Sequence, residues 1–292
     1  MKRKIEKIYD APAPHWVGNA FRVHNFFPSG SITDKYRMSP FFLLDYGSKI
    51  DFPGTEDPRG VGAHPHRGFE TVTIAYKGKV AHHDSFGNAG VIGEGDVQWM
   101  TAAGGILHKE YQEKEWSKTG GEFQMVQLWV NLPAKDKMTK PAYQAITRDQ
   151  FGKYMLENDQ GYIEVIAGNY KGVKGSATTF SPIEMYNARL NADAEIDFTL
   201  PENYNTAMLV IEGKVSIDNQ PVETDQFVLF ENKGTDISLR AETNAVVLVL
   251  SGEPIRENIF AYGPFVMNTR DEILQAYEDF NQGKVGYLNR VC

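Results

Sequence analysis

The chain has 292 residues, 41% hydrophobic and 12% aromatic, which is enough for a packed core and excludes a disordered protein. Its net charge of −8, with one basic run at residues 1–4, argues against direct binding of nucleic acid. No apolar run reaches the roughly 18 residues of a membrane span, and the N-terminus lacks the apolar core of a signal peptide. The one cysteine, Cys292, can form no intramolecular disulfide. We therefore expect a cytoplasmic protein without membrane or nucleic-acid partners.

The first half of the chain has the pattern of β-strands. Residues 69–84 and 124–132 alternate between apolar and polar side chains, and glycines punctuate the short β-rich runs around them. A polar, helix-compatible stretch with a proline follows at residues 132–154, and the β pattern then resumes. We predict a mainly β protein with two domains, residues 1–150 and residues 151–292.

A faint internal repeat links the two predicted domains. The tripeptide Gly-Lys-Val occurs at residues 78–80 and again at 213–215, and an acidic turn at Asp96 and at Asp225 opens a strand in each half. The common order of these features indicates a duplicated β-barrel unit. All seven histidines lie at or before His108, so only the first barrel is expected to carry a histidine-based site.

The end of the chain predicts an amphipathic helix instead of strands. Thr269 is followed three residues later by Glu272, which is the spacing of a capping box, and Gly283 is a suitable stop. Between them, one predicted face carries Ile273, Leu274, Tyr277 and Phe280. We predict one C-terminal helix of about three turns that packs on a barrel.

Four side chains in the first half are spaced so that they can converge. His64 and His66 alternate on one strand, and His108 and Glu110 alternate on another, so each pair points to one side. Three neutral imidazoles and one carboxylate suit Fe(II), and also Mn, Co, Ni, Cu or Zn. Four protein ligands in an octahedral site would leave two positions open for chemistry. The alternative is coincidence, because exposed strands also produce alternating polar residues.

The region around these residues resembles the pirin family, a branch of the cupins. The resemblance rests on the stretch from "HPHRGFETV" to "GGILHKE" (64–110), on "MSPFFLLDYG" (38–47), on "VQLWVNLPAKDKM" (126–138) and on "GPFVMNT" (263–269). It implies two cupin-type β-barrels, a bicupin, of which the N-terminal barrel alone holds a metal, most often iron. Such a fold would be completed by the C-terminal α-helix.

The resemblance also implies which residues hold the metal. His64, His66, His108 and Glu110 match the ligands of the family, and all four are intact. Cupins in general often take their glutamate a few residues after the first histidine pair, which here is Glu70. The pirin pattern takes the carboxylate from the second pair, so we choose Glu110 and expect a supporting or structural role for Glu70.

Other candidate residues are weaker. Of the neighbours His82 and His83, at most one can face into a barrel, and we expect a solvent-facing or supporting role for them. His15 and His24 are expected at the surface or in loops. Trp99, like Phe69, is expected in the core.

The resemblance implies an enzyme as the first function. Some pirin-like proteins are similar to dioxygenases that open the ring of the flavonol quercetin with O₂, and Glu110 would then be both ligand and general base. The second hypothesis is a regulatory module whose iron senses redox state and whose surface binds a protein partner. In the third hypothesis, the protein binds a metal but has no role with flavonoids, and its natural substrate is another small enol or phenol.

Overall fold

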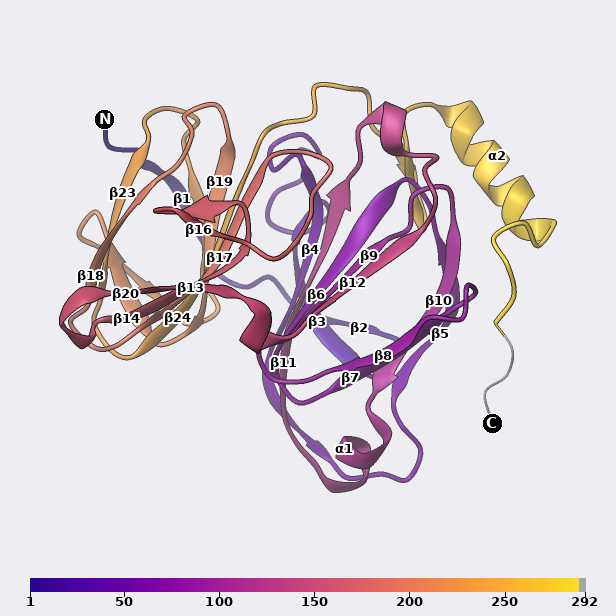
Figure 1. The fold of residues 1–292 in the computed structure, drawn as a ribbon, viewed down its shortest axis with the longest axis horizontal. Helices are drawn as coiled ribbons and strands as arrows, with labels where there is room; N and C mark the ends of the chain where they lie inside the picture. Colours follow the sequence, from indigo (N-terminus) through magenta and orange to yellow (C-terminus); the bar gives the residue numbers. More distant parts are fainter. Residues whose placement is uncertain (289–292) are drawn as a thin grey trace. The chain divides into compact units, whose positions relative to one another are not determined.

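The computed structural model describes residues 1–288, which form two compact units (Figure 1). Of the described residues, the first unit contains 13–35, 41–148 and 255–288, and the second contains 1–12, 36–40 and 149–254. Cys292 lies outside the described residues.

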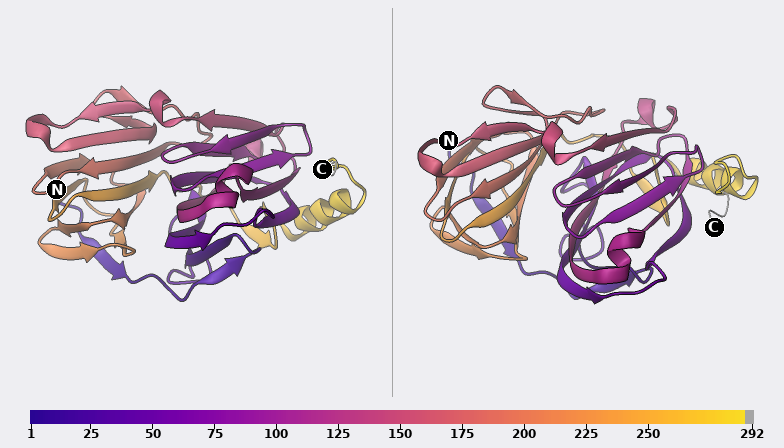
Figure 2. Two further views of the ribbon diagram at one scale, coloured as in Figure 1. Left: turned by 90° about the horizontal axis from the view of Figure 1, so that it is seen from below. Right: turned by 60° about the horizontal axis from the view of Figure 1, so that its bottom comes forward.

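The first unit is built from two antiparallel sheets, which Figure 2 shows from two further directions. Its large sheet has the order β12 (Ala142–Ile146), β9 (Val97–Thr101), β6 (Phe69–Lys77), β11 (Gly120–Asn131), β4 (Phe41–Pro53), β3 (Phe21–Phe27) and β2 (His15–Val17). Its small sheet has the order β5 (Gly60–His66), β10 (Ile106–Gln112), β7 (Val80–Asp84) and β8 (Ala89–Ile92). Alternate residues of β10 are buried, which turns His108 and Glu110 into the interior.

The second unit repeats this strand order. Its large sheet has the order β1 (Ile5–Tyr9), β22 (Phe227–Phe230), β19 (Asn205–Glu212), β24 (Ala245–Gly252), β17 (Ile183–Leu190), β14 (Gly161–Ala167) and β13 (Gly152–Met155). Its small sheet has the order β18 (Glu195–Thr199), β23 (Asp236–Ala241), β20 (Lys214–Ile217) and β21 (Gln220–Glu223), and β15 (Asn169–Tyr170) pairs with β16 (Val173–Lys174). Gly78 and Gly213, at φ 78° and 84°, make the equivalent turns. The order of the strands agrees with the predicted duplication.

The interior of the second unit is filled with apolar side chains. Phe198, Phe230 and Tyr186 belong to one buried cluster there, together with valines and isoleucines from both sheets. Among the described residues, the one cluster of histidine or acidic side chains with metal-binding spacing lies in the first unit.

The two units differ from the predicted domains at both ends of the chain. The chain changes units between Arg148 and Asp149, near the predicted boundary. However, β1 pairs with β22 and supplies the last strand of the second unit's large sheet. In the first unit the equivalent position is taken by β12, from the stretch that precedes the boundary. The second unit thus takes one edge strand from outside its main run of sequence, whereas β12 lies within residues 41–148 of the first unit.

The predicted helix-compatible stretch contains no α-helix. It forms β12, β13 and short 3₁₀ turns at Ala134–Asp136 and Arg148–Gln150, and a further 3₁₀ turn follows at Glu157–Asp159. A short helix, α1 (Lys114–Thr119), lies between β10 and β11.

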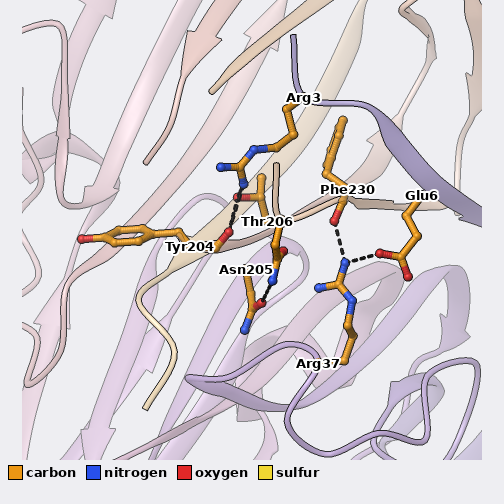
Figure 3. A network of polar contacts seen from close by, with 8 residues as sticks. Arg3, Glu6, Arg37, Tyr204, Asn205, Thr206 and Phe230 are labelled. Atoms are coloured by element: carbon orange, nitrogen blue, oxygen red, sulfur yellow. Dashed lines mark hydrogen bonds and ion pairs between the residues drawn. The ribbon is translucent and has the colours of Figure 1, made fainter. Parts of the chain in front are cut away.

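Two arginines hold the short segments 1–12 and 36–40 within the second unit (Figure 3). Arg3 is fully buried and donates to the carbonyl oxygens of Gly234 at 2.9 Å and Tyr204 at 3.0 Å. Arg37 forms an ion pair with Glu6 and donates to the Phe230 carbonyl oxygen at 2.6 Å. These bonds tie the two segments to β22 and to the loops that contain Tyr204 and Gly234.

The chain ends in the first unit with the hairpin of β25 (Phe260–Tyr262) and β26 (Phe265–Met267), followed by α2 (Arg270–Asn281). The predicted capping box of Thr269 and Glu272 is present. Ile273 is buried with Ala276, whereas Leu274 is 55% exposed, so the prediction that Leu274 belongs to the packed face was wrong. No helix in the described part of the chain is long and apolar enough to span a membrane.

Candidate metal centre

Three predicted ligands come together in the small sheet of the first unit. His64 and His66 end β5, and His108 lies on the adjacent strand β10 as the direct partner of His64. One nitrogen from each ring lies within 4.8 Å of the others. His66 and His108 are buried, and His64 is partly exposed.

Backbone carbonyls orient two of the rings. Nδ1 of His64 lies 2.8 Å from the Gly62 carbonyl oxygen, and Nδ1 of His66 lies 3.3 Å from that of Pro264. A carbonyl oxygen can only accept, so each Nδ1 carries the hydrogen and each Nε2 keeps a free lone pair. Histidine ligands in metal sites are fixed by such bonds to the second ring nitrogen.

The donor set fits a divalent transition metal. Nε2 of His64 and Nε2 of His108 are 2.8 Å apart. Two nitrogens bound at ~2.1 Å and at right angles to one ion would be about 3.0 Å apart. Burial and then His64 hold the pKa of His66 well below its usual range, and burial and then His66 do the same for His108. Neutral imidazoles, the form that binds metal, are therefore present at neutral pH.

Glu110 lies beside the three histidines but outside that cluster. The register of β10 against β5 shifts between His108 and Glu110, and the buried carboxylate accepts from Gln127 Nε2 at 3.0 Å and from Thr73 Oγ1 at 3.4 Å. Burial raises the pKa of Glu110, and the charge of His64 and the hydrogen bonds from Gln127 and Thr73 oppose that rise. This carboxylate is placed to take up a proton near the histidines.

Glu70 faces away from the cluster. The strand β5 ends at His66 and β6 begins at Phe69, and Gly68 between them has φ 87°, so strand parity does not continue from the histidines to Glu70. The Glu70 carboxylate accepts from Thr101 Oγ1 at 2.7 Å, and burial raises its pKa to about 7. This hydrogen bond links the side chains of paired residues on β6 and β9.

His82 and His83 point to opposite faces of β7, as the alternation of side chains along a strand requires. His82 is buried, pairs across the strands with Glu110 and lies 2.5 Å from the Tyr143 hydroxyl, whereas His83 points toward Tyr111 on the other face. His15 is exposed as expected. The expectation that His24 lies at the surface was wrong, because β3 buries it and its ring hydrogen-bonds the Ser48 hydroxyl.

A cavity of about 300 Å³ adjoins the cluster. Its lining is largely apolar and comprises Val17, Phe21, Val23, Val61, Met125, Trp129, Gly263 and Pro264, with Asp45, His64, His66, Glu110 and Gln127 as its polar members. The ring centroid of Trp129 lies 5.2 Å from that of His66. Trp129 also stacks on the buried Phe69, with 4.2 Å between the ring centroids. The positions of Asp45, Gln127 and Thr73 in the site could not be predicted from the sequence, because they depend on which strands lie side by side. The arrangement can hold an ion at the wall of a small, largely apolar cavity.

Comparisons with known proteins place the chain in a family. The family model described as Pirin matches residues 20–130, and the model described as Pirin C-terminal cupin domain matches residues 185–286. A relative from Pseudomonas aeruginosa is 45% identical over 282 residues, which cover 97% of this chain and 98% of its own. The chain belongs to the pirin family.

The similarity of this pirin to known proteins extends to solved structures. A quercetin 2,3-dioxygenase from Acinetobacter baumannii is 44% identical and superposes with a TM-score of 0.93 over 99% of this chain and 100% of its own. The relative from Pseudomonas aeruginosa is named "Putative quercetin 2,3-dioxygenase". A bacterial pirin from Escherichia coli in complex with nickel(II) shares the fold at 22% identity, with a TM-score of 0.65 over 85% of this chain and 100% of its own.

Proposed function

We propose that this pirin is a metal-dependent dioxygenase that opens the ring of a flavonol such as quercetin with O₂. His64, His66 and His108, with Glu110, would hold one divalent transition metal, with Fe(II) as the first choice. The observation that carries the proposal is the meeting of three histidine rings at the wall of a largely apolar cavity. Its similarity to the Acinetobacter baumannii enzyme supports the choice of substrate.

The protein's own residues have separable tasks in this reaction. A bound divalent ion would supply a Lewis acid that acidifies a coordinated hydroxyl and a redox centre for O₂. Glu110 would accept the proton of the flavonol 3-hydroxyl, and its raised pKa makes it a stronger base than an exposed glutamate. Gln127 and Thr73 hold that carboxylate in place, and the apolar walls exclude water from the deprotonated flavonol. The products would be carbon monoxide and a depside.

The test is O₂ consumption and carbon monoxide release with quercetin, after reconstitution with Fe(II), Mn(II), Co(II), Ni(II), Cu(II) or Zn(II). The parent is compared with Glu110→Gln, and metal content is measured on the same samples. We expect turnover by the parent with at least one metal and a loss of about 100-fold or more in the variant, the usual contribution of a general base. Full turnover by Glu110→Gln would remove the base assignment. Absence of turnover with every metal, despite stoichiometric binding, would overturn the proposed function.

A further inference from the structure

Asp45 presents an unusual carboxylate to the cavity. It lies on β4, is 8% exposed, and lines the same cavity as His64, His66 and Glu110. One oxygen, Oδ1, accepts from the side-chain amide of Asn25 at 2.8 Å. Within the described chain, the second oxygen has neither a hydrogen-bond donor nor an ion-pair partner.

The register of the large sheet connects Asp45 to the candidate base. Asn25 pairs with Asp45, Asp45 with Gln127, and Gln127 with Thr73. Direct partners in an antiparallel sheet face the same side, so these four polar residues form one row along the inner wall. Gln127 in this row donates to Glu110. Asp45 therefore lies one strand, about 4.8 Å, farther along the wall than the residue that holds the base.

A carboxylate oxygen that lines a cavity and has no partner in the protein is available to a ligand that enters the cavity. Burial raises the pKa of Asp45, and the hydrogen bond from Asn25 opposes that rise. Buried polar atoms are normally satisfied, and a cavity-facing oxygen can be satisfied by a ligand that enters the cavity. None of the residues that line the cavity is a lysine or an arginine, and the one charge that also lowers the pKa of Asp45 is that of His15.

The surroundings restrict what that ligand can be. Phe21, Met125 and Trp129 give the cavity walls that suit an aromatic ring. A cationic group would be disfavoured, because three imidazoles, one carboxylate and a divalent ion leave a charge of about +1 nearby. A neutral donor that belongs to an aromatic ring, a phenolic hydroxyl, satisfies both conditions.

We propose that Asp45 is a specificity-determining residue, which accepts a hydrogen bond from a phenolic hydroxyl on a ring remote from the hydroxyl that Glu110 deprotonates. This inference rests on the proposed function and narrows its substrate class to polyhydroxylated aromatics with hydroxyls on separate rings. A flavonol without remote hydroxyls would fill the cavity but leave Asp45 unpaired.

The experiment compares quercetin with unsubstituted 3-hydroxyflavone in the parent and in Asp45→Asn. The substitution keeps the shape of the side chain at position 45. Asn25 still donates to the oxygen of the new amide, so the NH₂ group of that amide faces the ligand and cannot accept its hydrogen bond. Two quantities are measured: kcat/KM of the reconstituted protein, and binding of each flavonol to metal-free protein by tryptophan fluorescence. We expect the preference for quercetin to fall roughly 10- to 100-fold in both, the usual range for a hydrogen bond to a charged group. 3-Hydroxyflavone should bind and react as in the parent.

The control is Asp51→Asn, an exposed aspartate on the same strand, which should leave the preference unchanged. Because each preference is a ratio within one sample, a misfolded fraction cancels. An unaltered preference in Asp45→Asn would overturn the inference. If the parent turns over neither flavonol, the proposed function fails, while the binding preference of metal-free protein still decides the role of Asp45.

Discussion

Gln127 donates its side-chain amide to both oxygens of Glu110, at 3.0 Å to Oε2 and 3.3 Å to Oε1. The two residues come from different sheets of the first unit, β11 and β10. A carboxylate held in this way is favoured in its charged form, so the bond tunes both the position and the basicity of Glu110.

Gln127→Met should weaken Glu110 as a positioned base while preserving the shape of the wall. Loss of the amide donor raises the pKa of Glu110, because that hydrogen bond lowers it in the parent. The base acts when deprotonated, so the acid limb of the kcat profile should move to higher pH. At pH 7 kcat should fall about tenfold, the value of one hydrogen bond to a charged group. An acid limb at the parent's pH would contradict this role, and Gln220→Leu, on the exposed side of the second unit, is the control.

Loss of any one histidine of the cluster should abolish tight metal binding. In His108→Ala, the ion would lose a buried nitrogen donor on which two other rings converge. We expect metal affinity to fall by at least about 100-fold, more than the effect of a residue that only orients a ligand. Titration with Fe(II) or Ni(II) under anaerobic conditions measures it. His83→Ala is a matched control, because that ring points toward Tyr111, and equal loss in the control would argue against a specific site.

The second unit should tolerate core damage without loss of the metal. Phe198 is fully buried in the apolar cluster that fills this unit, so Phe198→Ala should cost about 3–5 kcal/mol of its unfolding free energy. All four tryptophans belong to the first unit, so tryptophan fluorescence follows that unit while circular dichroism follows both. We expect an earlier urea transition by circular dichroism with one metal ion still bound per chain. Loss of the metal in this variant would contradict the assignment of the site to the first unit alone.

Local patterns were enough to predict the histidine cluster and the terminal helix. The alternation of β10 turns His108 inward because period two is a property of the strand itself, and the capping box of Thr269 is equally local. The direction of the Glu70 side chain could not be predicted from alternation alone. Gly68 interrupts the strand between His66 and Glu70, so Glu70 does not face the same way as the histidines.

Contacts between segments far apart in the sequence could not be predicted. The carbonyl that orients His66 belongs to Pro264, which lies in a segment of the first unit that follows the second unit in the sequence. Asp45 and Gln127 become neighbours only through the pairing of β4 with β11. No periodicity in one sequence specifies that register, because strand pairing depends on the packing of the complete sheet.

The C-terminal helix should stabilise the first unit in a pH-dependent way through Asp279. Its carboxylate bonds Lys284 Nζ at 2.9 Å and Arg67 Nη1 at 2.9 Å, and Arg67 directly follows the candidate ligand His66. Lys284, Arg67 and Gln275 together lower the pKa of Asp279 to about 2 from an ordinary 3.8.

A carboxyl whose pKa is lower in the folded than in the unfolded protein stabilises the fold above its unfolded pKa, and that contribution disappears as pH falls to the folded pKa. At pH 7, Asp279→Asn should therefore cost about 1–2 kcal/mol of unfolding free energy, because solvent screens part of these interactions. The difference from the parent should shrink between pH 4 and pH 2. Urea unfolding followed by tryptophan fluorescence at pH 7, 4 and 2.5 measures it, with Glu278→Gln on the exposed face of α2 as the control. A difference that stays constant across this range would show that Asp279 contributes through packing and not through its charge.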